Sequence, residues 1–295
     1  MKLIKSILYT SAVALLGLTA CDKELDIDSL DFDVSTAKTT YKLGDTVVFK
    51  FKGNPDNITL FTGEEGHKYE YRERLRAEGK PELSFTSFRQ YGTQTLPLEL
   101  LVSTTFNGKV DKDVANGGWK NITDKATFST TADNTPSGKI DLSEYVGDKP
   151  LYIAFHYKGE AGSTQRKWTI KNFEVSNKLT SGVTLTIADL SNAGFSEYSY
   201  SNPNVLWKIE ASQISIQGGP ATNEANDDWV VTQALYLDKV MPDSGMGLKN
   251  ITTKMTEYPY VFTKPGTYKV TFIASNATAD KSESVVKELE ITIEP

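Results

Sequence analysis

Short segments of the chain alternate between hydrophobic and polar residues with a period of two. They are rich in Val, Ile, Thr, Tyr and Phe, and they include Thr46–Lys52, Leu151–Tyr157, Lys167–Val175 and Thr267–Ile273. Such alternation turns one face of a strand toward a core, and β-branched and aromatic residues fit a pleated surface. Helical periodicity is confined to Glu70–Glu78, which is equally compatible with an extended strand. The pattern predicts an all-β sandwich.

The two ends of the chain carry complementary halves of one pattern. Tyr41–Phe51 resembles the opening strands of a PKD-type immunoglobulin-like (Ig-like) module, and Tyr260–Phe272 resembles its closing half. Neither half is complete alone. Because the ends of a domain often lie close together and loop tips tolerate insertions, we expect residues 30–70 and 248–295 to form one Ig/PKD-like sandwich, into which residues 71–247 are inserted.

The inserted stretch carries five motifs in a fixed order. They are Leu100–Phe106, Trp119–Thr123, Ser137–Gly147, Leu151–Tyr157 and Trp168–Val175. In this order they resemble the choice-of-anchor jelly-roll family of Bacteroidetes surface proteins, which implies a jelly-roll β-sandwich in the insertion. His156 stands where that family usually has Arg or Lys.

A further motif of that family stands out of order. Asp228–Gln233 resembles the family's Asp-Trp-Leu-Ile-x-Pro motif, but here it follows the Val-Ser-Thr strand instead of preceding it. The resemblance therefore implies that the jelly roll is circularly permuted. The permutation predicts that the strand near Trp229–Leu237 lies beside or close to the strand near Leu83–Phe88.

The N-terminus has the features of a secretory signal. Lys2 and Lys5 precede an apolar run, Ile7–Leu16, that is too short to span a bilayer. The tetrapeptide that ends at Cys21, Leu-Thr-Ala-Cys, resembles the bacterial lipobox. This resemblance implies removal of the signal peptide, residues 1–20, and lipidation of Cys21.

Residues 21–29 form an acidic tether after the signal. The sequence Asp-Lys-Glu-Leu-Asp-Ile-Asp that follows Cys21 resembles the surface-export signal of Bacteroidetes lipoproteins, and an ordinary solvated tether is the alternative. Export implies an outer-membrane protein that faces the cell exterior and meets the membrane through its lipid anchor only. The whole chain resembles an uncharacterised lipoprotein family of gut Bacteroidetes, known mainly as a domain of unknown function.

Composition narrows the range of partners. The 295 residues include 32 basic and 38 acidic ones, and the net charge of −6 becomes −8 once Lys2 and Lys5 are removed. Nucleic-acid binding needs clustered Lys and Arg in excess, so we expect none. Like-charge repulsion also disfavours polyanionic glycans. The single cysteine excludes a disulfide framework, and 14 Tyr, 13 Phe and 4 Trp argue against a disordered chain.

Recognisable catalytic motifs are missing from the sequence. His67 and His156 are the only histidines, and no zinc motif, Walker loop, Gly-x-Ser-x-Gly elbow or Gly-x-Gly-x-x-Gly turn is present. The Glu64-Glu65 pair falls in an expected turn, where solvated acids are favoured over a glycosidase pair. Asp111-Lys-Asp113 could ligate calcium, but the loop lacks the glycine and distal glutamate of an EF-hand, so an ordinary polar loop is preferred. We expect no catalytic residues, no cofactor and no metal site.

The aromatic residues fall into two groups. Those that alternate with polar residues in predicted strands are assigned to the core: Trp119, Trp168 and Trp229. A second group, Tyr198, Tyr200 and Trp207, lies in or next to a predicted loop rich in small polar residues. Aromatic rings pack against the C–H faces of sugars while neighbouring polar groups bond the hydroxyls. We interpret this group as glycan-stacking residues, with packing at the edge of the jelly roll as the alternative.

Together these patterns predict a surface-anchored, non-enzymatic lipoprotein that binds a neutral polysaccharide or oligosaccharide. Its role would resemble that of accessory proteins beside SusC/SusD-type glycan importers, so outer-membrane transport proteins are candidate partners. A weak site is sufficient, because many anchored copies on one polymer raise the avidity. The alternative is a structural or adhesin-like protein-interaction lipoprotein without a sugar site.

Overall fold

The computed structural model describes residues 30–95 and 98–295. These residues form two compact units. Unit 1 combines the N-terminal part up to Arg74 with Pro242–Pro295, and unit 2 is the continuous stretch Leu75–Met241. The insertion predicted from the sequence, residues 71–247, extends a few residues beyond unit 2 at both ends. The predicted signal peptide, the tether and the lipidation site Cys21 lie outside the described residues.

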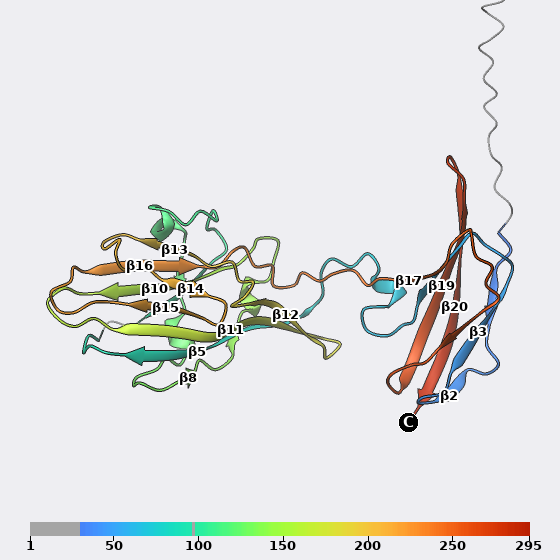
Figure 1. The fold of residues 1–295 in the computed structure, drawn as a ribbon, viewed down its shortest axis with the longest axis horizontal. Coiled ribbons are helices and arrows are strands. Elements are labelled where there is room, and N and C mark those ends of the chain that lie inside the picture. Colours follow the sequence, from blue (N-terminus) through green and yellow to red (C-terminus); the bar gives the residue numbers. More distant parts are fainter. Residues whose placement is uncertain (1–29, 96–97) are drawn as a thin grey trace, which may run out of the picture. The chain divides into compact units, whose positions relative to one another are not determined.

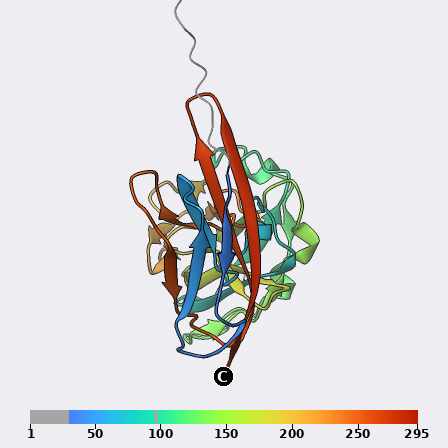
Figure 2. The ribbon, with the colours of Figure 1, turned by 90° about the vertical axis from the view of Figure 1, so that its right-hand side faces the viewer.

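Unit 1 is a sandwich of two sheets (Figure 2). The smaller sheet has the order β1 (Asp33–Ser35), β3 (Val47–Lys52) and β18 (Glu257–Tyr260). The larger sheet has the order β17 (Met246–Lys249), β4 (Asn57–Phe61), β19 (Gly266–Ala277), β20 (Ser282–Glu294) and β2 (Thr40–Lys42). Both sheets join the two ends of the chain, because β3 pairs with β18 and β4 pairs with β19.

Alternate apolar positions fill the core of unit 1. Val47 and Phe49 of β3 are fully buried, as are Val270 and Phe272 of β19. The Phe49 and Phe272 rings meet edge to face with their centroids 5.0 Å apart. The period of two in these segments therefore corresponds to side chains that point between the two sheets.

Unit 2 is a second, larger sandwich (Figure 1). One sheet has the order β13 (Ser196–Ser199), β16 (Asn226–Val231), β10 (Tyr152–Gly159), β6 (Glu99–Ser103) and β7 (Lys120–Asn121). The other has the order β14 (Lys208–Glu210), β15 (Gln213–Gln217), β11 (Lys167–Leu179), β5 (Gly79–Gln90) and β8 (Thr135–Pro136). Two short strands complete this second sheet: β12 (Thr184–Asp189) pairs with β11, and β9 (Ile140–Asp141) pairs with β5.

Strand β10 is buried on both faces, although its alternating sequence predicts one wet face. Phe155 points into the main core, where its ring lies perpendicular to that of Phe85 at 5.2 Å. Ala154 faces the other way, into a second cluster that contains Phe106 and Val114. The segment between β6 and β7, which carries these two residues, covers this face. A covering loop therefore adds a third layer over part of the five-stranded sheet.

Helix is limited, over residues 30–95 and 98–295, to four short 3₁₀ turns. They are η2 (Tyr69–Tyr71), η3 (Val114–Asn116), η4 (Thr123–Lys125) and η5 (Ser143–Tyr145). The stretch Glu70–Glu78 is therefore mostly a connection between η2 and β5, and it contains no α-helix. No helix in the described part of the chain is long and apolar enough to cross a membrane. The all-β sandwich prediction is confirmed.

The strand neighbours expected from the permutation are not found. β16, which contains Trp229, belongs to the five-stranded sheet, whereas β5, which contains Leu83, belongs to the other sheet. One link lies at the end of the segment, where Asn177, opposite Pro81 in the β5–β11 ladder, donates from Nδ2 to the Leu237 carbonyl at 3.0 Å. The two strands are not hydrogen-bonded neighbours, because they lie on opposite layers of one sandwich. They lie close in the sense that Leu83 and Leu237 belong to the same core cluster.

Candidate functional site

Four side chains form a row across the outer face of the five-stranded sheet. The register places Glu99 of β6 opposite His156 of β10, His156 opposite Trp229 of β16, and Trp229 opposite Tyr198 of β13. Side chains on a strand alternate between its faces. Because the neighbouring Phe155 lies in the main core, these four residues project from the opposite face. We call them the outer-face row.

His156 joins two carboxylates at one end of this face. Its Nδ1 lies 2.8 Å from Glu99 Oε2, and its Nε2 lies 2.8 Å from Asp227 Oδ1. An ionised carboxylate accepts a hydrogen bond from a ring N–H, so each of the two contacts suits a donor nitrogen of the imidazole. The hydrogen bond from His156 is the main reason why the pKa of Asp227 lies below its usual value. Lys158 adds a positive charge, 3.8 Å from Glu99.

The imidazole of His156 rests on an aromatic surface. The His156 and Trp229 rings are stacked with centroids 4.1 Å apart and an interplanar angle of 21°. Trp119 of the covering loop packs against the Trp229 ring at 5.6 Å. Trp168 and Trp229 are buried and Trp119 is half-buried, which agrees with their assignment to the interior. This packing fixes the orientation of His156 between its two carboxylates.

Tyr198 and Tyr200 stand together next to the outer-face row. Their rings meet edge to face with centroids 4.9 Å apart. The Tyr200 backbone N–H donates to the Asp227 carbonyl at 2.9 Å, which holds the residue beside β16. The Tyr200 hydroxyl donates to the Lys112 carbonyl at 2.6 Å and accepts from the Ala115 N–H at 3.3 Å. Tyr200 is still 40% exposed, so the pair forms an aromatic corner at the sheet edge.

Trp207 does not belong to this corner. Its side chain is 3% exposed and lies in the main core, where the indole N–H donates to the Asp228 carbonyl at 3.3 Å. The prediction that it stacks on a glycan is therefore wrong. The polar residues before Trp207 suggested a surface loop. Burial of its large apolar indole is nevertheless favourable, because one hydrogen bond satisfies the indole N–H.

The predicted loop acids have structural partners. Glu64 accepts hydrogen bonds from the Tyr260 hydroxyl and from the Thr263 hydroxyl, which lie 2.5 and 3.1 Å away. Asp111 Oδ1 accepts from the Asp113 N–H at 2.9 Å, which closes a turn. Within the described ranges, no three or more His, Cys, Asp or Glu side chains are grouped to hold a metal ion.

Asp228 carries a buried carboxyl group that was not predicted from the sequence. It is 1% exposed and neither of its oxygens has a hydrogen-bond partner among the described residues. Loss of hydration raises the pKa of Asp228 to about 7. The sequence did contain a signal, because Asp228 and the core residue Val230 occupy alternate positions of one strand and must share a face.

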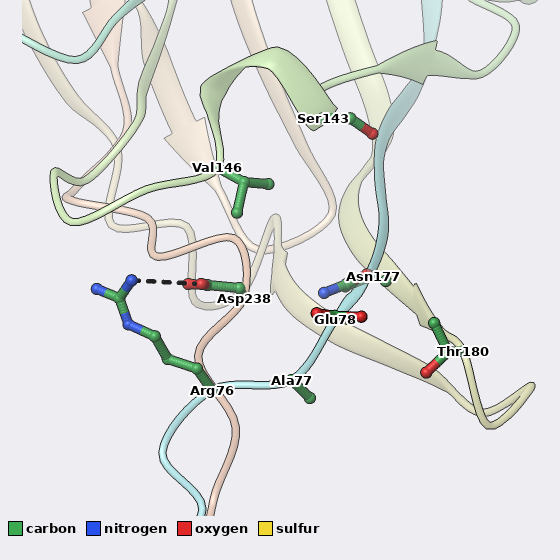
Figure 3. A pocket seen from close by; sticks show the side chains of 9 residues that line it. Arg76, Ala77, Glu78, Ser143, Val146, Asn177, Thr180 and Asp238 are labelled. Carbon is green, nitrogen blue, oxygen red and sulfur yellow. Dashed lines mark hydrogen bonds and ion pairs between the residues drawn. The ribbon is translucent and has the colours of Figure 1, made fainter.

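A cavity of about 480 Å³ opens at the start of β5 (Figure 3). It is lined by residues of unit 2 from four segments: Arg76–Gly79, Ser143 with Val146, Asn177 with Thr180, and Asp238. The Arg76 guanidinium lies 3.5 Å from Asp238 and 3.0 Å from Asp148. No local pattern in the sequence indicates this cavity, because its walls come together only through the β5–β11 pairing and the return of the chain at Asp238.

These features define an all-β protein of two sandwich units, the second inserted between β4 and β17 of the first. The chain belongs to the DUF5017 family, described as a domain of unknown function, whose model matches residues 20–195, more than half of the chain. No curated protein and no solved structure matches it. The family match includes Glu99 and His156 and ends just before β13, so Tyr198 and Tyr200 lie outside it.

Proposed function

We propose that the protein is a non-enzymatic lipoprotein, anchored in the outer membrane through Cys21 and facing the cell exterior, that captures a neutral polysaccharide or oligosaccharide. The observation that carries the proposal is the aromatic corner of Tyr198 and Tyr200 at the edge of the five-stranded sheet. A sugar ring can lie against one tyrosine face while its rim touches the other. The corner lies on a sheet edge, where a polymer can pass without threading into a closed pocket.

Polar groups beside the corner suit sugar hydroxyls. The side chain of Asp227 is 36% exposed and that of Glu99 is 27% exposed, so both carboxylates remain partly accessible while His156 fixes their positions. Hydroxyl groups donate to such carboxylates and accept from Lys158. The two carboxylates leave this cluster without an excess of positive charge, which disfavours a polyanionic ligand.

The resemblance of each unit to a particular domain family is part of the same proposal. Unit 1 resembles an Ig/PKD-like module, and unit 2 resembles a choice-of-anchor jelly roll of Bacteroidetes surface lipoproteins. In that setting the protein assists a SusC/SusD-type uptake system by holding polysaccharide near the importer. Many anchored copies would bind one polymer together, so each site needs only a millimolar affinity, equivalent to about −4 kcal/mol.

The test is affinity electrophoresis of the chain from Asp22 to Pro295 through gels that contain neutral polysaccharides. We expect at least one glycan to retard the wild-type protein, and Tyr200→Ala to weaken retention about tenfold through the loss of one aromatic contact. Tyr236→Ala is the matched control, because Tyr236 and Tyr200 are both 40% exposed but Tyr236 lies outside the corner. Equal losses in the two variants would reject the corner as the site, and no retardation on any glycan would reject glycan capture.

Burial of Trp207 favours the alternative function, because it removes one of the three predicted stacking rings. In this alternative the protein is a structural or adhesin-like lipoprotein that binds another protein. The electrophoresis separates the two functions, since a protein-binding surface gives no retardation by any polysaccharide in the panel.

A further inference from the structure

Unit 1 has a cavity of its own, with a volume of about 310 Å³. Three segments line it: the turn after β4 (residues 64–67), the end of β18 with the residues that follow it (260–264), and Tyr268 of β19. All three segments belong to unit 1. Hydrogen bonds from Gly63 N to His67 O and from His67 N to Glu64 O, both of 2.9 Å, close the turn. The walls are therefore held in place by the fold of a single sandwich.

One wall of this cavity is aromatic. The Tyr268 ring is stacked on Phe262, with centroids 4.6 Å apart and an interplanar angle of 25°, and Phe262 is buried. The Tyr268 hydroxyl donates to the Lys264 carbonyl at 2.8 Å, so the ring is held at its face and at its tip. Tyr260 meets Phe262 edge to face at 5.0 Å. Both tyrosines are half-buried, and together they form a fixed aromatic surface that suits the C–H face of a sugar ring.

The carboxylates of the cavity already have partners. Glu64 Oε2 accepts from the Tyr260 hydroxyl, and its Oε1 accepts from the Thr263 hydroxyl at 3.1 Å and from the Thr263 N–H at 3.4 Å. Glu65 lies 3.7 Å from the ammonium group of Lys68. Glu64 therefore acts as a brace for the aromatic wall, and the polar groups of a ligand have to meet other side chains.

Two polar groups beside the aromatic wall have no partner. His67 Nδ1 lies 2.7 Å from the Ser244 carbonyl, which only accepts, so Nδ1 carries the hydrogen and Nε2 of the neutral ring is an acceptor. His67 Nε2 has no hydrogen-bond partner among the described residues, and it is not enclosed by protein atoms. Lys264 is exposed, and its ammonium group makes no hydrogen bond or ion pair with any described residue. The cavity thus offers one free acceptor and one free donor group.

We propose that this cavity is a second sugar-binding site, in which a neutral pyranose ring lies against Tyr268. A sugar hydroxyl both donates and accepts, so one hydroxyl can donate to His67 Nε2 while another accepts from Lys264. The negative charges of Glu64 and Glu65 disfavour a ring that carries a carboxylate. The volume of about 310 Å³ lies at the lower end of the range for ligand pockets, which suits a single ring. The site goes beyond the proposed capture at the aromatic corner, because it stands on residues of unit 1 alone.

The two histidines allow each site to be observed separately. His67 lies in this cavity, His156 lies in the outer-face row beside the aromatic corner, and the chain has no other histidine. The chain from Asp22 to Pro295, without a tag and labelled with ¹⁵N in histidine, is titrated with glucose, galactose or mannose and followed by NMR at about pH 8, where an ordinary imidazole is neutral. His67→Gln assigns the two sets of signals. We expect at least one sugar to shift the His67 Nε2 signal and to saturate this shift at millimolar concentration.

Two lysine variants and one polyol make the result specific. Lys264→Ala should raise the dissociation constant about fivefold, as the loss of one exposed, charge-assisted hydrogen bond implies. Lys254→Ala removes the same charge from an exposed position of unit 1 outside the cavity and should leave binding unchanged. Sorbitol carries similar hydroxyl groups but has no ring to lie on Tyr268, so it should cause no saturable shift.

The outcomes for the two sites can be read independently. Tyr200→Ala should leave the response of His67 unchanged, and a response of His156 alone would report on the aromatic corner and not on this cavity. The proposal would be overturned by the absence of a saturable His67 shift with all three sugars up to about 100 mM. An equal response to sorbitol, or equal affinities of the two lysine variants, would also overturn it.

Discussion

Asp228→Asn is expected to stabilise unit 2 by about 4 kcal/mol at pH 8 and to have little effect near pH 4. The pKa of Asp228 rises from an ordinary value of 3.8 to about 7 because its carboxyl is removed from water. One pKa unit corresponds to about 1.4 kcal/mol. The folded protein therefore holds this proton more tightly than the unfolded chain does, and stability declines as the pH rises from about 4 to about 7. The asparagine side chain has a similar shape and no charge, so it avoids this decline.

The measurement is urea unfolding at a series of pH values, followed by tryptophan fluorescence. All four tryptophans belong to unit 2, so the signal reports this unit alone. Asp227→Asn is the control, since its carboxyl is the next residue but faces His156, which holds its pKa below 3.8. That variant should lose stability above about pH 4, the opposite sign to Asp228→Asn. Parallel pH profiles for wild type and Asp228→Asn would contradict the buried, unpaired state of Asp228.

Trp207→Ala is expected to destabilise unit 2 by about 3–5 kcal/mol, the usual cost of truncating a buried aromatic side chain. Trp207 lies in the main core, with its ring centroid 6.4 Å from that of Phe155. Removal leaves a cavity and takes away the donor to the Asp228 carbonyl. Urea unfolding followed by the remaining tryptophans measures the loss.

Trp207→Phe serves as the second variant if the alanine variant does not fold. It keeps an aromatic ring in the core, and we expect a smaller loss of about 1–2 kcal/mol from the missing hydrogen bond and the smaller ring. Retention by a glycan should be unchanged in the folded fraction of either variant. If Trp207→Ala were stable but no longer retained by a glycan, Trp207 would have to be counted among the glycan-binding residues.

The local alternation of hydrophobic and polar residues was sufficient to predict strands and the all-β fold class. The period of two around Phe49 and around Phe155 identifies strands. The alternation within each segment is enough to show which face of the strand is apolar. The pattern did not show that β10 is buried on both faces. That burial comes from Phe106 and Val114 of the covering loop, and no local rule connects a loop to the strand that it covers.

The candidate site was only partly predictable for the same physical reason. Tyr198 and Tyr200 were visible as aromatic residues in polar surroundings, and they do meet in space. Glu99, His156 and Asp227 come together only through the register of β6, β10 and β16, which long-range packing determines. Trp207 was misplaced because its burial depends on the opposite sheet and not on the residues beside it in the sequence.

Because unit 2 is an insertion, the chain passes between the two units twice, and we call these two connections, Arg74–Leu75 and Met241–Pro242, the crossings. Inside unit 2 the entering and leaving segments are joined by hydrogen bonds from Val240 N to Leu75 O and from Ala77 N to Asp238 O, at 3.0 and 2.9 Å. The β3–β18 and β4–β19 ladders hold the halves of unit 1 together. A protease that nicks one crossing therefore leaves the molecule in one piece, and unit 2 is shed only after both have been cut.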